Sequence, residues 1–119
     1  MRDAPILVID DDATIRETVA DILADEGYRV QLAANGAEGL SALGQERPAL
    51  ILLDRWMPIL DGIGFVQALR AQGQYIPIVA MTAAHDARQW AEEIKAVAIL
   101  PKPFKLEALF NLVAEALRP

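Results

Sequence analysis

The chain of 119 residues contains no cysteine and only one histidine, His85. Without cysteine it can form no disulfide, and it offers neither a thiol nucleophile nor a Cys-ligated zinc site. A single histidine cannot build a histidine-based metal centre. No apolar run approaches the ~20 residues that cross a bilayer, and residues 1–5 do not form a secretory signal. These absences lead us to expect a cytoplasmic protein that does not enter the membrane.

Positive charge is also scarce. The chain has 11 lysines and arginines against 17 aspartates and glutamates, a formal net charge of −6. This excess of negative charge argues against direct binding to the phosphate backbone of a nucleic acid. The hydrophobic fraction of 54% and the charged fraction of 24% are those of an ordinary globular protein. We therefore expect residues 1–119 to form one domain around one core.

Four short apolar runs are present, and each of them ends in polar residues. The runs at 6–9, 50–53, 78–81 and 97–101 lead into Asp10-Asp11-Asp12, Asp54, Thr82 and Lys102, respectively. Short, uninterrupted apolar runs are typical of strands that are buried on both faces of a parallel sheet. If the four strands are parallel neighbours, their polar ends meet at one edge, where open α/β sheets place their ligand sites.

Helical spacing of apolar residues separates the predicted strands. It occurs in five segments, marked by residues 15–23, 37–43, 65–69, 90–94 and 106–117. Residues 28–32 alternate between polar and apolar, as a further strand does. The resulting order is strand–helix repeated five times, which predicts an open five-stranded parallel sheet with helices on both faces. Pro101 cannot donate to a sheet ladder, so the strand at 97–101 is predicted at an edge.

The predicted edge gathers acidic groups that cannot all be ionised side by side without compensation. Two like charges ~4 Å apart repel by ~4 kcal/mol at an effective dielectric constant of ~20. Asp10, Asp11 and Asp54 must therefore hold protons or bind a cation. Oxygen ligands favour a hard ion such as Mg²⁺. With the ammonium of Lys102 and the hydroxyl of Thr82, this set is suited to phosphoryl transfer onto an aspartate.

Four motifs in order carry a resemblance to a known family. They are Val8-Ile9-Asp10-Asp11-Asp12, then residues 53–62 (LDRWMPILDG), Met81-Thr82-Ala83-Ala84, and Lys102-Pro103-Phe104. With these motifs the chain resembles the receiver domains of bacterial two-component response regulators, whose single-domain form includes the chemotaxis regulator. The resemblance covers essentially the whole chain. It implies the flavodoxin-like fold with strand order 2-1-3-4-5.

The resemblance also implies a role for each site residue. Asp54 would accept a phosphoryl group from a phosphohistidine on a sensor histidine kinase or a His-phosphotransfer protein. Such a domain catalyses its own phosphorylation and dephosphorylation. Asp11 would ligate Mg²⁺ (or Mn²⁺) directly, Asp10 mainly through water, and Trp56 through its backbone carbonyl.

Two more residues would bind the phosphoryl oxygens, namely Thr82 and Lys102, with a cis peptide bond between Lys102 and Pro103. Phosphorylation would switch the face formed by the fourth helix, the last strand and the fifth helix, which would act on a downstream effector domain or protein. Ile99 stands where many receivers have an aromatic residue, so switching would rely on Thr82 and on backbone shifts. The interval from Thr82 to Lys102 is also slightly short, which predicts an altered or mobile fourth helix.

Two other functions are compatible with parts of this pattern. Asp10 and Asp12 also fit the nucleophile and the acid/base of a haloacid dehalogenase-like phosphatase, although this leaves the motif around Asp54 without a purpose. The second alternative is a degenerate receiver that only binds a partner. Loss of Asp11, Asp54 or Lys102 would indicate it, and all three residues are present. Asp12 and Asp61 are interpreted as helix caps, and His85 as a solvated residue near the start of a helix.

Overall fold

A computed structural model describes residues 4–83 and 85–118. Strands and helices alternate along the whole chain, in the order β1 (Ile6–Ile9), α1 (Ala13–Asp25), β2 (Val30–Ala33), α2 (Gly36–Gln45), β3 (Leu50–Asp54), α3 (Gly62–Ala71), β4 (Ile78–Thr82), α4 (Ala87–Ile94), β5 (Ala98–Pro101) and α5 (Leu106–Ala116). The strands form one parallel sheet in the order β2-β1-β3-β4-β5. The predicted fold is confirmed, including the edge position of the strand that contains Pro101.

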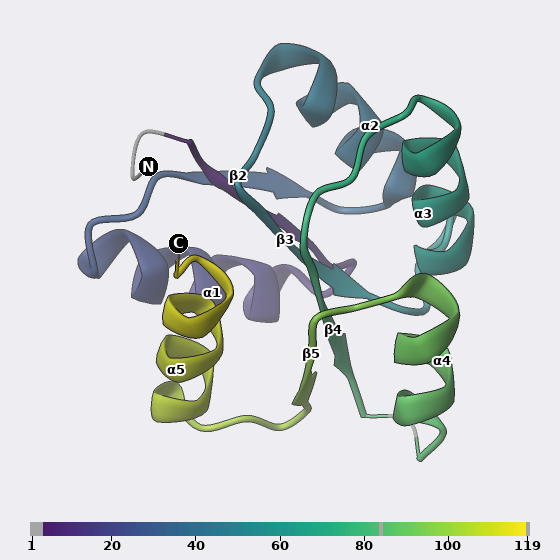
Figure 1. Cartoon of the computed structure of the whole chain (residues 1–119). Helices are drawn as coiled ribbons and strands as arrows, with labels where there is room; N and C mark the ends of the chain where they lie inside the picture. Colours follow the sequence, from purple (N-terminus) through teal and green to yellow (C-terminus); the bar gives the residue numbers. More distant parts are fainter. Residues whose placement is uncertain (1–3, 84, 119) are drawn as a thin grey trace.

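The two faces of the sheet are covered by different helices. Figure 1 shows α1 and α5 on one face and α2, α3 and α4 on the other. Successive side chains of a strand point to opposite faces. In β1, Ile6 and Val8 pack in the core under α1 and α5, while Leu7 and Ile9 pack in the core under the other three helices. This double coverage explains why the central strands are continuously apolar rather than alternating.

Side-chain caps begin three of the helices. The carboxylate of Asp12 accepts hydrogen bonds from the backbone N–H groups of Thr14 and Ile15 at the start of α1. Asp61 accepts one from Gly64 at the start of α3, and Asn35 caps α2 in the same way. Both aspartates are therefore the helix caps that the sequence predicted.

The fourth helix is the shortest among the described helices, with eight residues. It ends at Lys95, which has a φ of 56° in the left-handed region where helices usually place glycine. The short length of α4 agrees with the expectation of an altered fourth helix. The mobility of α4 stays a prediction. His85 lies exposed in the turn before α4. Within the described residues, no helix is long and apolar enough to cross a membrane.

Candidate phosphoryl-transfer site

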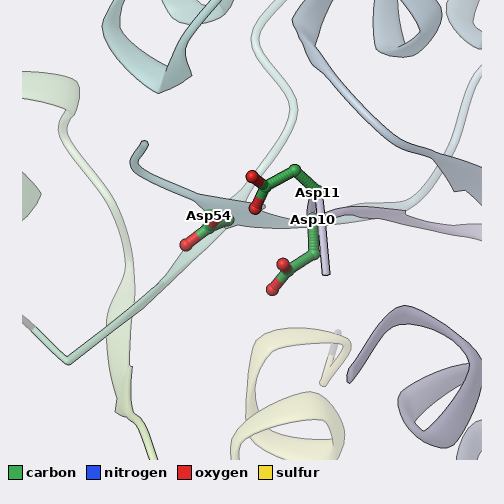
Figure 2. Close-up of side chains that lie close together, drawn as sticks. All are labelled: Asp10, Asp11 and Asp54. Atoms are coloured by element: carbon green, nitrogen blue, oxygen red, sulfur yellow. The ribbon is translucent and has the colours of Figure 1, made fainter. Parts of the chain in front are cut away.

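The register of the sheet brings the predicted carboxylates together. Ile9 of β1 pairs with Leu53 of β3, so the residues that follow them lie side by side at the carboxyl edge: Asp10 directly after β1 and Asp54 at the end of β3. Figure 2 shows Asp10, Asp11 and Asp54 projecting from these two neighbouring strand ends. Each contributes one carboxylate oxygen to a group whose members all lie within 4.8 Å of one another. The expected acidic cluster is present.

Lys102 closes this cluster from the edge strand. Its Nζ lies 2.7 Å from Oδ2 of Asp10 and 3.1 Å from Oδ1 of Asp54. Alternation along the strands explains the meeting, because Asp10, Asp54 and Lys102 continue the series of side chains that point toward α1 and α5. The Asp10 side chain is fully buried, and those of Asp54 and Lys102 are 12% and 15% exposed. Asp54 is therefore the more accessible of these two carboxylates.

Burial and neighbouring charges shift the pKa values of Asp54 and Lys102. Loss of hydration, followed by repulsion from Asp10, raises the pKa of Asp54 to about 6, although Lys102 opposes the change. Burial by itself lowers the pKa of Lys102, but its hydrogen bond to Asp10 and the charge of Asp54 outweigh this and raise it overall. One ammonium thus leaves the cluster short of positive charge.

The charges and oxygen atoms of the cluster suit a bound cation. Three carboxylates lie together, and the ammonium of Lys102 pairs with two of them, Asp10 and Asp54. Burial and then the charge of Asp10 raise the pKa of Asp54 in spite of this ammonium. Asp11 is exposed and can turn one oxygen toward a bound ion without losing a buried partner. Oxygen-only ligands with open space for water suit Mg²⁺ or Mn²⁺. The residues present fit such an ion.

The remaining predicted site residues lie around the cluster. Thr82 ends β4 and is buried, and its carbonyl accepts a hydrogen bond of 3.1 Å from the backbone N–H of Lys102. The peptide bond between Lys102 and Pro103 is cis, as the resemblance implied. Trp56 lies two positions beyond Asp54, and this residue is 61% exposed.

Comparison with known proteins is consistent with this geometry. Residues 6–114 match the profile of the response regulator receiver domain. The chain belongs to this family. The receiver domain is 39% identical over 115 residues to the response regulators MprA of Mycolicibacterium vanbaalenii and of Mycobacterium avium, which is 95% of the chain and 50% of each relative. It thus spans about half the length of these relatives.

Solved structures give the same result. The receiver domain superposes on Vibrio cholerae chemotaxis protein CheY4 with a TM-score of 0.86 and 34% identity, covering 95% of this chain and 98% of that one. It matches the receiver domain of NtrX from Brucella abortus with a TM-score of 0.85 and 32% identity, covering 94% and 97%. The chain is therefore a module of phosphorylation-activated signalling, as the sequence motifs predicted.

The phosphatase alternative finds no support in the structure. It requires Asp12 to act as an acid/base beside Asp10, but the carboxylate of Asp12 caps α1 through two backbone hydrogen bonds. Asp12 is also absent from the carboxylate group that Asp10, Asp11 and Asp54 form. The motif around Asp54, which that alternative left unexplained, forms the centre of the site.

One feature of the site was missed at the sequence level. The side chain of Arg55, which directly follows Asp54, forms an ion pair of 2.7 Å with Asp86 at the start of α4. The two residues are 31 positions apart. No periodicity or motif spacing connects residues at such a distance, so the sequence carried no signal for this pair.

Proposed function

We propose that Asp54 is the residue that accepts the phosphoryl group. Its carboxylate is the partly exposed member of the buried pair at the carboxyl edge of the sheet, where a donor can reach it. With a pKa of about 6, it is ionised near neutral pH and retains more basicity than an ordinary aspartate. In the reaction an Asp54 oxygen forms a bond to phosphorus as the phosphorus–nitrogen bond of a phosphohistidine breaks. The imidazole leaves and takes up a proton.

The proposed cation is Mg²⁺, with Mn²⁺ as a substitute. Asp11 and Asp54 would ligate it directly, Asp10 mainly through water, and Trp56 through its backbone carbonyl. The bound ion would neutralise charge on the phosphoryl oxygens. The convergence of Asp10, Asp11 and Asp54 within 4.8 Å is the observation that carries this proposal.

Lys102 and Thr82 would bind the transferred group. The ammonium of Lys102 already spans the two buried carboxylates, so a small movement brings it to a phosphoryl oxygen on Asp54. The hydroxyl of Thr82, at the end of the neighbouring strand, would bind a second oxygen as a donor. Catalysis in such a site consists mainly of positioning and charge neutralisation.

The donor would be a sensor histidine kinase or a His-phosphotransfer protein. We further propose that residues 1–119 act as one receiver domain, which switches its α4-β5-α5 face and thereby controls an effector domain or protein. Two observations support this wider assignment: the match to the receiver family over residues 6–114, and the greater length of the MprA relatives.

The test uses a small-molecule phosphodonor with Mg²⁺, and intact-mass and peptide spectrometry. We expect one added phosphoryl group on Asp54, lost in Asp54→Ala and lost when Mg²⁺ is removed with a chelator. Asp12→Asn serves as the matched control and should still be labelled. Label on Asp10 would favour the phosphatase alternative. A wild-type chain without label would indicate a degenerate receiver that only binds a partner.

A further inference from the structure

Arg16 of α1 makes a hydrogen bond back to the end of β1. Its Nη1 lies 2.9 Å from the backbone carbonyl oxygen of Asp10, six positions earlier. Helical side chains lean toward the N-terminus of their helix, so a long side chain near the start of α1 can reach the turn that precedes it. β2 ends at Ala33, opposite Ile9, so the carbonyl of Asp10 lies beyond the last residue pair of that ladder. Arg16 therefore provides this carbonyl with a donor from outside the sheet.

The contact of Arg16 is with a neutral group, although acidic residues lie close by. Three aspartates precede α1 directly, yet Arg16 forms no ion pair in the part of the chain that the structure describes. A charged donor makes a stronger hydrogen bond to a carbonyl than a neutral one does. This choice of partner indicates that Arg16 fixes the path of the backbone rather than the charge of a carboxylate.

The hydrogen bond completes a set of contacts around Asp10. The N–H of Asp10 donates to the carbonyl of the last residue in β2 at 3.1 Å, and its Oδ1 accepts from the N–H of Asp12 at 2.9 Å. Its Oδ2 pairs with Lys102. With Arg16 on the carbonyl, every polar group of Asp10 has a partner. The backbone on both sides of Asp11 is thereby held in place.

Asp11 is the cluster member that depends on this backbone. It is exposed, and among the described residues its carboxylate makes neither a hydrogen bond nor an ion pair. Figure 2 nevertheless shows its carboxylate turned toward Asp54. On a fixed backbone an aspartate has only a few staggered rotamers, whereas a loose turn would spread the same side chain over many directions. The turn at residues 10–12 therefore decides where this carboxylate points.

We propose that Arg16 is a positioning residue for the cation site: its hydrogen bond to the carbonyl of Asp10 holds the turn at residues 10–12, so that Asp11 points into the acidic cluster before an ion binds. This inference rests on the Mg²⁺ site of the proposed function. Ligands that are already in place bind more tightly, because less conformational freedom is lost on binding. Groups behind the ligands of a metal ion commonly change its affinity about tenfold or more.

Charge and position predict opposite effects of removing Arg16. The guanidinium lies beside the residues of the cluster and repels a cation, so loss of its charge alone would tighten Mg²⁺ binding. Loss of the hydrogen bond would weaken Mg²⁺ binding, because the ion would then have to order the turn itself. The direction of the change therefore identifies the role.

The test measures the dissociation constant of Mg²⁺ by isothermal titration calorimetry on residues 1–119. The ionic strength is fixed and the pH is 8, above the pKa of Asp54. Arg16→Met should raise the dissociation constant by roughly three- to tenfold. Arg16→Lys keeps a cationic donor and should recover most of the affinity. Arg47→Met is the matched control. It removes the same charge from an exposed arginine that precedes β3 and bonds to Gln74, and it should leave the dissociation constant unchanged.

A second measurement reports on the turn without any ion. The N–H of Asp12 donates to Oδ1 of Asp10, so its hydrogen exchange, followed by NMR, reports how well the turn is held. In Arg16→Met without Mg²⁺ this amide should exchange roughly three- to tenfold faster than in the wild type. The amides of β3 should keep their wild-type rates, which shows that the fold is intact.

The outcomes separate this inference from the function beneath it. If the wild-type chain binds no Mg²⁺, the proposed cation site and the role of Arg16 are both overturned. If the wild type binds Mg²⁺ and Arg16→Met binds it equally or more tightly, only the role of Arg16 is overturned. Weaker binding together with faster exchange throughout β3 would also overturn that role, because it would reflect a general loss of stability. Mg²⁺ binding without phosphorylation of Asp54 would contradict the proposed function and leave the role of Arg16 in place.

Discussion

At the scale of single residues, Asp54 combines a functional position with an energetic cost. Its pKa is raised from 3.8 to about 6, mainly by burial and then by the charge of Asp10. A folded carboxylate with a raised pKa binds protons more tightly than the unfolded chain does. Its ionisation therefore destabilises the fold, fully above pH 6 and progressively less as the pH falls from 6 toward 4.

Replacing Asp54 by asparagine should consequently stabilise the protein in the absence of divalent cations. We expect the free energy of unfolding at pH 8 to rise by about 1–2 kcal/mol, measured by urea denaturation. The gain should shrink below pH 6 and vanish near pH 4. Asp21→Asn, which removes an exposed negative charge from the same net charge of −6, is the control and should give a much smaller change. A gain that persists at pH 4 would contradict the assignment.

Ile59 carries backbone strain in the loop after β3. Its φ is 71°, and the N–H of Leu60 donates to the carbonyl of Pro58, so Ile59 is the central residue of a tight γ-turn. A β-branched residue is disfavoured at positive φ. The residue is 82% exposed, so packing does not offset this cost.

Ile59→Gly should therefore raise the free energy of unfolding by about 1 kcal/mol, after the entropy that glycine adds to the unfolded chain is subtracted. Thermal or urea denaturation measures the change. Ile59→Ala keeps the Cβ atom and hence the strain, so it should leave stability nearly unchanged. Equal gains in the two variants would mean that the exposed side chain, and not the backbone, is responsible.

At the scale of elements, the start of α3 is packed tightly against the end of β3. A Cβ atom on Gly62 would lie 2.9 Å from the carbonyl oxygen of Asp54 and 2.8 Å from the ring of Trp90. The N–H of Gly62 also donates to the carbonyl of Arg55. The helix can therefore approach the acceptor residue this closely only because the side chain is absent. Gly44, near the end of α2, has open space around it.

Alanine substitution should separate these two glycines. Gly62→Ala should lower the free energy of unfolding by about 1–3 kcal/mol, because backbone must shift to relieve the contact. Gly44→Ala should raise it by up to about 1 kcal/mol, because alanine is the better helix former in a site with room. Denaturation curves give both values. A Gly62→Ala protein as stable as wild type would show that the loop after β3 yields easily.

At the scale of the whole molecule, one sheet joins two cores to one site. The helices α1 and α5 cover one core and α2, α3 and α4 the other, and the carboxyl ends of β1 and β3 lie at the edge of the sheet between them. The acidic cluster lies at this edge and so belongs to no single element. Any ligand that binds there stabilises the fold as a whole, by mass action.

Mg²⁺ should accordingly stabilise the receiver domain against unfolding. At a free concentration ten times its dissociation constant, the expected gain is about 1.4 kcal/mol. Urea denaturation with and without Mg²⁺ measures it, with NaCl at equal ionic strength as the control for screening of the net negative charge. Asp11→Asn should lose most of the gain and Asp21→Asn none of it. An equal effect of NaCl would contradict a specific site.

The sequence by itself determined the class of fold, the edge position of one strand and the identity of the clustered residues. Those features follow from local patterns: apolar runs that end in polar residues, helical spacing between them, and Pro101 in a strand that must lie at an edge. The full strand order was implied only by the resemblance to receiver domains. Once the strands are parallel and in register, alternation places the side chains of Asp10, Asp54 and Lys102 on the same face at the carboxyl edge, where they meet.

Only the tertiary structure decided the contacts of the loops. The pairing of Arg55 with Asp86, the stacking of Trp56 and the positive φ of Ile59 depend on the path of the chain between elements. Loops have no repeating period that fixes where a side chain points. Their contacts join residues far apart in the chain, and these follow from how the finished helices pack on the sheet.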